Sequence, residues 1–230
     1  MKRLRHLCIL AITLCQMPVT LQAQDDPDPA RFAQEIDAFA QWDRKNSPPA
    51  EAILFVGSSS IRFWPTAARF PGLPVINRGF GGAHISDVNH YLERVVLKYT
   101  PRAIVFYAGD NDIAGEKTPE RVVADYHAFV ERVHAALPGT PIVFVPIKPS
   151  LSRWSMWPRM AQANAAIQAY SEAHAALFYA DMATPMLGED GTPRPGLFIK
   201  DGLHLSEAGY DLWTRILTPY LERIMQQRGE

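Results

Sequence analysis

The chain has 230 residues, of which 47% are hydrophobic and 20% are charged. This length suits one sizeable domain, and the two fractions are ordinary for a globular protein, which argues against disorder along most of the chain. The formal charge is −1, and no run of basic residues occurs beyond the first few positions. Nucleic acid is therefore not expected as a partner.

Residues 1–23 have the three parts of a secretory signal peptide. Three basic residues precede an apolar run over 7–14, and Ala23 lies at the expected cut. The bulky Leu21 leaves the cut open within a few positions. An uncleaved anchor is the alternative, but the apolar run is shorter than the roughly 20 residues that a spanning helix needs. We expect a periplasmic or secreted protein without stable membrane insertion after processing.

Both cysteines, Cys8 and Cys15, fall within this segment. The processed chain would then have no disulfide, no thiol nucleophile and no cysteine-based metal site. Four histidines on predicted helices show no ligand pair on a common face: His90, His127, His134 and His174. We expect neither a metal ion nor another cofactor.

After a linker at 24–28, one domain is expected over 29–230, in which helices and strands alternate. A helix over 29–46 is predicted by apolar residues spaced three and four apart. Short apolar runs bounded by glycine, proline or polar residues predict buried strands. The strands are expected at 52–56, 74–77, 103–108, 142–147 and 177–180, and the further helices at 85–99, 118–137, 159–174 and beyond Ser206. This alternation is typical of a three-layer αβα sandwich with a five-stranded parallel sheet.

Polar groups are expected at the carboxyl edge of this sheet, where open α/β sheets bind ligands. Serines occupy 58–60 after the first strand, a glycine-rich loop spans 78–84, polar residues fill 109–112, and Asp201 and His204 precede the last helix. Each signal alone has a simpler interpretation, such as a helix cap or a turn. Together they supply what acyl transfer requires: a hydroxyl, a base, a carboxylate and oxyanion donors.

Four motifs resemble those of the SGNH/GDSL hydrolase family. Residues 57–59 (GSS) stand where the family usually has G-D-S, residues 77–83 resemble its second block, 109–112 match G-x-N-D, and 201–204 match D-x-x-H. Their order and spacing cover nearly all of the processed chain. The family consists of esterases and lipases that need no cofactor, and the resemblance implies a flavodoxin-like α/β fold.

The resemblance also implies roles for individual residues. Ser59 would be the nucleophile, His204 the general base and Asp201 the carboxylate that orients it. The oxyanion donors would be the backbone amides of Ser59 and Gly82 and the side chain of Asn111. An Asp three residues before a His can hold the ring at Nδ1 and leave Nε2 free to face a serine.

One departure from the family stands beside the nucleophile. Ser58 replaces the usual Asp, which removes a charge and leaves Ser58 and Ser60 as alternative nucleophiles. His84 is either a substrate contact or a polar loop residue. The loops 148–158 and 182–200 would border the pocket, and four of their side chains either contact substrate or belong to the core: Trp154, Met156, Trp157 and Phe198.

The expected activity is hydrolysis of a small-molecule carboxylic ester through an acyl-enzyme. Short-chain or acetyl esters, including O-acetylated sugars, suit the sequence better than bulk lipid, because no lid helix or amphipathic membrane segment is predicted. The alternatives are a lysophospholipase or thioesterase type of acylhydrolase, and a secreted binding module without catalysis that holds an anion on the amides of 57–60. The sequence does not predict the oligomeric state.

Overall fold

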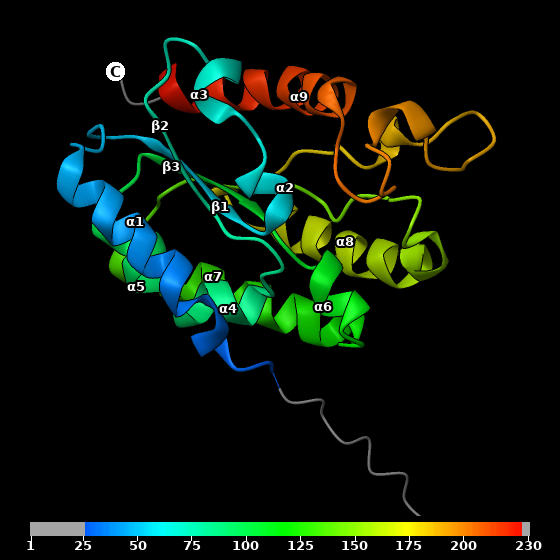
Figure 1. The fold of residues 1–230 in the computed structure, drawn as a ribbon, viewed down its shortest axis with the longest axis horizontal. Coiled ribbons are helices and arrows are strands. Elements are labelled where there is room, and N and C mark those ends of the chain that lie inside the picture. The colour runs from blue at the N-terminus through cyan, green and yellow to red at the C-terminus, as the bar shows by residue number, and fades with distance from the viewer. Residues whose placement is uncertain (1–25, 227–230) are drawn as a thin grey trace, which may run out of the picture.

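The computed structural model describes residues 26–226, which form a five-stranded parallel sheet between two layers of helices (Figure 1). The expected signal segment, 1–23, lies outside the described residues. The strand order is β2-β1-β3-β4-β5. The strands are β1 (Ile53–Gly57), β2 (Val75–Gly79), β3 (Ala103–Tyr107), β4 (Ile142–Phe144) and β5 (Leu177–Tyr179). The predicted αβα sandwich is confirmed.

Most of the helices lie where the sequence predicts them. They are α1 (Ala33–Lys45), α2 (Ser59–Arg62), α3 (Thr66–Arg69), α4 (Ile85–His90), α5 (Leu92–Val95), α6 (Asp110–Ala114), α7 (Pro119–Ala136), α8 (Trp157–Glu172) and α9 (Glu207–Gln226). Short 3₁₀ turns occur at Pro29–Phe32, Leu97–Tyr99, Trp154–Met156, Thr184–Met186 and Pro195–Leu197. Within the described chain no helix is both long and apolar enough to cross a membrane.

Two predicted elements differ from the structure. The helix expected over 85–99 is divided into α4, α5 and a 3₁₀ turn, because Tyr91 and Val96 leave helical geometry and Thr100 is left-handed (φ 42°). The strand expected over 142–147 ends at Phe144. Pro146 has no N–H to continue the ladder, although the Val145 N–H still donates to the Phe106 carbonyl (2.9 Å).

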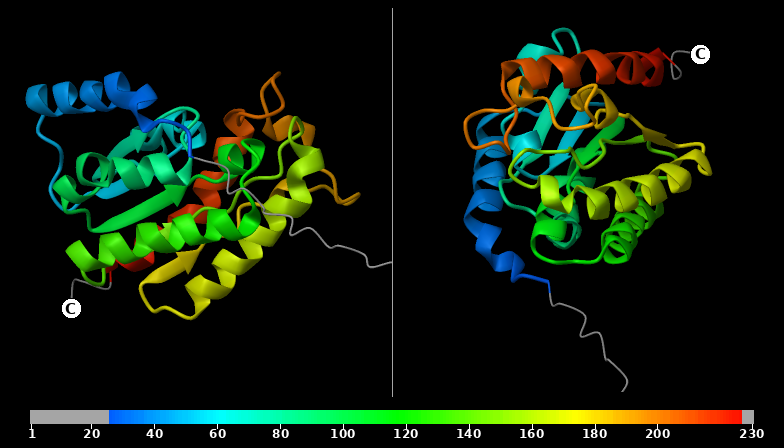
Figure 2. Two further views of the ribbon diagram at one scale, coloured as in Figure 1. Left: turned by 90° about the horizontal axis from the view of Figure 1, so that it is seen from below. Right: turned by 90° about the vertical axis from the view of Figure 1, so that its right-hand side faces the viewer.

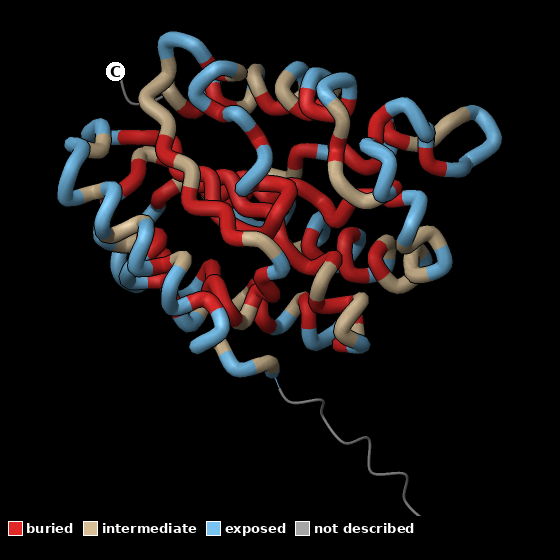
Figure 3. Tube along the Cα trace, in the orientation of Figure 1, coloured by how far each residue is buried: buried red, intermediate tan, exposed pale blue. Residues whose placement is uncertain are grey.

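Strand side chains alternate between two buried cores, and the central strands are buried along their length (Figure 3). Leu54 and Val56 of β1 pack toward α1, α4, α5, α7 and α8. Ile53 and Phe55 pack toward the face that α9 covers together with the short helices α2 and α3 (Figures 1 and 2). Both faces of the central strands are covered, which explains why their sequences are continuously apolar.

Gly57 allows the first strand to turn directly into α2. Its φ is +139°, and a Cβ at this position would lie 1.8 Å from the Tyr107 carbonyl oxygen of β3. Only glycine fits such an approach. The Ser58 N–H then donates to the same carbonyl (2.9 Å), so the serines begin immediately beyond the sheet edge.

Asn164 of α8 fixes the chain where it leaves β4. Its side-chain oxygen accepts from the Ile147 N–H (2.8 Å), and its amide donates to the Ile147 carbonyl (2.9 Å). Both contacts are buried, and they replace the ladder bonds that the strand loses after Phe144. This pairing sets the start of the loop that carries Lys148 and Arg153.

Asp112 fastens the glycine-rich loop to α6. Both of its carboxylate oxygens accept from the Ile85 N–H (3.1 and 3.2 Å), and the Lys117 Nζ lies 3.0 Å away. Lys117 also donates to Asp125 (2.9 Å). Burial raises the pKa of Asp112 to about 6, against the pull of Lys117 toward the ionised form.

Replacing Asn164 with Leu should destabilise the fold by about 2–4 kcal/mol, because the Ile147 N–H and C=O would be buried without partners. Chemical denaturation measures this cost. Gln168→Leu on the exposed face of the same helix is the control, with an expected change below about 0.5 kcal/mol. Equal effects of the two substitutions would contradict the role given to Asn164.

Asp112→Asn should change how stability depends on pH. The folded chain holds the Asp112 proton up to about pH 6, whereas an unfolded Asp releases it near pH ~4. The contribution of Asp112 to the free energy of unfolding therefore falls as the pH rises from about 4 to about 6. The wild-type value minus the variant value should fall by roughly 2 kcal/mol between pH 4 and pH 6.5. Denaturation curves at several pH values measure it, and a difference independent of pH would refute the assignment.

Candidate functional site

Ser59 is the first residue of α2 and alone among the three adjacent serines reaches the histidine. Its Oγ lies 3.0 Å from the Nε2 of His204. The Ser58 Oγ is buried and has no hydrogen-bonding partner among the described residues. The Ser60 Oγ accepts from the Nζ of Lys148 (3.0 Å). Ser59, the serine that the family resemblance selects, is thus the one of the three within hydrogen-bond distance of His204.

His204 lies at the end of a tight turn that also holds Asp201. The Ile199 N–H donates to the His204 carbonyl and the Gly202 N–H to the Ile199 carbonyl, each at 2.9 Å. The Asp201 Oδ2 is 2.6 Å from the Nδ1 of His204, and its Oδ1 accepts from the N–H groups of Leu203 (2.8 Å) and His204 (2.9 Å). Ser59, His204 and Asp201 thus form one hydrogen-bonded line.

The charge of Asp201 is stabilised by these contacts. Slight burial opposes ionisation, but the hydrogen bonds from the His204 ring and from two backbone N–H groups lower the pKa of Asp201 to about 2. The carboxylate stays negative at neutral pH. It can orient the Nδ1–H of His204 and stabilise a positive ring without accepting the proton itself.

The three candidate oxyanion donors lie at the start of α2, in the glycine-rich loop and on α6. The backbone N–H groups of Ser59 and Gly82 have no acceptor within the part of the chain that the structure describes. Gly82 has φ +83° and faces open space. The Asn111 Nδ2 donates to the Ala83 carbonyl (3.1 Å), which ties α6 to the glycine loop. A Cβ on Gly81 would lie 4.0 Å from that of Ser59, so the loop and the start of α2 are adjacent.

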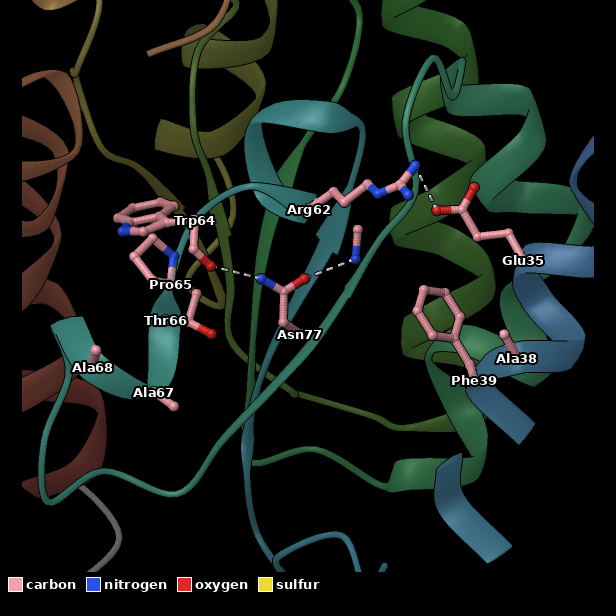
Figure 4. A pocket seen from close by; sticks show the side chains of 11 residues that line it. Glu35, Ala38, Phe39, Arg62, Trp64, Pro65, Thr66, Ala67, Ala68 and Asn77 are labelled. Atoms are coloured by element: carbon pink, nitrogen blue, oxygen red, sulfur yellow. Dashed lines mark hydrogen bonds and ion pairs between the residues drawn. The ribbon is translucent and has the colours of Figure 1, made fainter. Parts of the chain in front are cut away.

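Phe63 borders the triad, and Arg62 faces a neighbouring pocket. The Phe63 ring is half exposed and lies edge-on to the His204 ring, with centroids 5.2 Å apart. Arg62, at the other end of α2 from Ser59, pairs with Glu35 of α1 (3.1 Å). This pair lines a pocket of about 630 Å³ between α1, α3 and the edge strand β2, shown in Figure 4, where Asn77 joins β2 to the Trp64 carbonyl. The pocket adjoins the glycine loop through Gly79.

His84 is packed inside the protein. Its N–H donates to Asp87 (2.8 Å), and a Cβ on Gly115 of α6 would meet its ring at 2.9 Å. Burial lowers the pKa of His84, which favours the neutral ring. Of the two roles that the sequence left open for His84, this position favours a polar loop residue over a substrate contact.

The structure also places the four side chains of the loops 148–158 and 182–200 whose role the sequence left open. Phe198 is buried in the core beneath α9, while Met156 and Trp157 pack against the opposite core. Trp154 stacks on Trp157 with ring centroids 6.1 Å apart. Three of the four residues whose role the sequence left open therefore contribute to the cores.

Sequence reasoning missed a buried charge cluster under the candidate oxyanion donors. The Nζ of Lys148 lies 3.0 Å from the Asp110 Oδ2 and donates to the Tyr107 hydroxyl (2.9 Å). Burial opposes the ionisation of Asp110, but Lys148 and Arg153 lower its pKa below the usual value. The sequence did contain a signal for this cluster. Asp110 lies just beyond a fully apolar strand, where a buried charge needs a cation, and Lys148 follows the next strand.

Within residues 26–226 no three His, Cys, Asp or Glu side chains are grouped so that they could hold a metal ion. A hydroxyl, an imidazole held by a carboxylate and backbone N–H donors are the groups that acyl transfer uses.

Solved structures similar to this chain share its fold. A GDSL-like lipase from Bacteroides thetaiotaomicron has a TM-score of 0.68 and 21% identity, over 85% of this chain and 98% of that one. An acetylxylan esterase from Geobacillus stearothermophilus, solved as a catalytic mutant, has a TM-score of 0.60 and 16% identity, over 76% of this chain and 94% of that one. No curated protein sequence matches this chain.

The sequence profile of the GDSL-like lipase/acylhydrolase family matches residues 58–212. This match covers more than half of the chain and contains Ser59, Asn111 and His204. The four motifs, the parallel sheet and the profile agree. The chain therefore belongs to the GDSL-like lipase/acylhydrolase family and is a hydrolase of that family.

Proposed function

We propose that this protein is a serine esterase that cleaves carboxylic esters through an acyl-enzyme, with Ser59 as the nucleophile. The observation that carries the proposal is the line from the Ser59 Oγ to the His204 Nε2 (3.0 Å) and from the His204 Nδ1 to Asp201 (2.6 Å). Each contact joins groups whose chemistry is complementary: a hydroxyl, a base and an ionised carboxylate.

In the first step His204 takes the proton of Ser59 as the oxygen attacks the ester carbonyl. The negative charge that develops on the carbonyl oxygen is stabilised by the N–H groups of Ser59 and Gly82 and by the amide of Asn111. His204 then donates its proton to the departing alcohol. In the second step it activates water, which hydrolyses the ester bond to Ser59 and restores the free enzyme.

We propose short-chain or acetyl esters as substrates, with O-acetylated sugars among the candidates. The similarity in fold to an acetylxylan esterase supports this class. The half-exposed Phe63 ring beside His204 offers an apolar surface to a small acyl group or to the C–H face of a sugar. A periplasmic or extracellular location, which residues 1–23 predict, would bring the enzyme into contact with acetylated glycans.

Ser59→Ala should lower the hydrolysis of p-nitrophenyl acetate by at least about 10³-fold, because the nucleophile is removed. Ser58→Ala is the matched control. Its Oγ has no partner among residues 26–226, so activity should stay within about threefold of wild type. Steady-state rates of the three proteins test the assignment. Full turnover by Ser59→Ala, or its loss in Ser58→Ala with an intact fold, would contradict it.

The same assay, extended over acyl lengths from acetate to decanoate and to acetylated xylan, tests the substrate class. The highest kcat/KM is expected for acetyl or other short acyl groups. A maximum at long acyl chains or thioesters would favour the lysophospholipase or thioesterase type. Absence of wild-type turnover on every ester would favour a binding module of the same fold.

A further inference from the structure

The side-chain amide of Asn111 can help an oxyanion only in one of its two orientations. Its NH₂ end must face the substrate, while its oxygen must point away. In the structure Nδ2 donates to the Ala83 carbonyl (3.1 Å), and Oδ1 accepts from the Nη2 of Arg153 (3.1 Å). Rotating the amide by 180° would place NH₂ against a guanidinium and oxygen against a carbonyl. The two neighbours together therefore select the useful orientation.

Arg153 needs support of its own, because it lies in a loop. Its Nη1 is 3.3 Å from the Oδ2 of Asp110, the residue before Asn111. Asp110 is 3% exposed and Lys148, which meets the same oxygen at 3.0 Å, is also buried. Separating Asp110 from Lys148 would leave an unpaired charge in the interior, so this pair offers Arg153, whose side chain is 18% exposed, a fixed partner.

The network reaches both sides of the candidate oxyanion site. At one end Arg153 contacts Asn111. At the other, the Nζ of Lys148 donates to the Oγ of Ser60, which follows the nucleophile in α2. One carboxylate lies between two cations, so the cluster carries a net positive charge.

We propose that Arg153, held by Asp110 and Lys148, is a positioning residue that keeps the amide of Asn111 turned toward the oxyanion. This inference rests on the proposed esterase function. It adds a residue outside the four family motifs, carried by the loop that Asn164 anchors at Ile147. Because Arg153 acts through Asn111, its removal should reduce the rate of the chemical step and leave substrate binding nearly unchanged.

The test compares Arg153→Met and Arg153→Lys with wild type on p-nitrophenyl acetate. Removing one oxyanion donor costs about 10²–10³ in kcat, and loss of its orientation should cost about 10–100-fold. Arg153→Met is expected to show this fall in kcat with KM within about threefold. Arg153→Lys, which keeps the charge but not the planar fork, should recover part of the rate. Arg215→Met on the exposed side of α9 is the control and should be unaffected.

A double-mutant cycle separates this role from a general structural one. In an Asn111→Ala background, Arg153→Met should lower kcat by no more than about twofold, because the amide that it positions is absent. An undiminished fall in that background would overturn the proposal. The proposal would also be overturned if Arg153→Met changed only KM. It would be overturned, too, if the loss of kcat were fully explained by a smaller folded fraction in denaturation measurements.

An NMR measurement of Asn111 tests the positioning role without measuring ester hydrolysis, so this role can be judged separately from the esterase function. In ¹⁵N NMR spectra, the side-chain NH₂ signals of Asn111 should be sharp in wild type and in Arg215→Met, and shifted or broadened in Arg153→Met. Unchanged Asn111 signals in Arg153→Met would refute the positioning. Absence of wild-type ester hydrolysis together with the expected spectral change would refute the esterase function and retain the positioning of the amide.

Discussion

The contact between the Ser59 Oγ and the His204 Nε2 joins residues 145 positions apart, and the catalytic proposal depends on it. It forms because β1 and the turn before α9 both end at the same edge of the sheet. Gly57 lets β1 approach β3 so closely that α2 starts without an intervening loop. The turn of His204 is held by the backbone bonds of Ile199 and Gly202. Each partner is positioned by backbone geometry, which costs no reorganisation during the reaction.

Much of this arrangement could be predicted from sequence, because the strands are short apolar runs and each ends in a recognisable polar motif. The order of the motifs implied that Ser59, Asn111 and His204 meet at one edge. In the structure the Ser59 Oγ lies 3.0 Å from the His204 Nε2, and Asn111 contacts the glycine-rich loop at Ala83. The break of the helix near Tyr91 could not be predicted, since the apolar spacing continues through it. The family resemblance selected Ser59 among the three serines, but the directions of their side chains, which a repeated residue does not reveal, required the structure.

The charge distribution around the nucleophile also required the structure. The family's usual Asp is absent at Ser58, whose Oγ is buried and has no partner in the part of the chain that the structure describes. The nearby carboxylate is instead Asp110, balanced by Lys148 and Arg153 from the loop after β4. These two cations lie 38 and 43 positions from Asp110 in the chain, and their pairing follows from the adjacency of β3 and β4. Of these three residues the motif at 109–112 contains only Asp110, so it could not reveal the part played by Lys148 and Arg153.

The most direct test of the central claim is to label the protein with a fluorophosphonate, which reacts with activated serines, and to map the modified peptide by mass spectrometry. The account predicts a single phosphonylated residue, Ser59, and no labelling after Ser59→Ala or after denaturation. Labelling at Ser58 or Ser60, or an esterase that hydrolyses p-nitrophenyl acetate but leaves Ser59 unmodified, would contradict it.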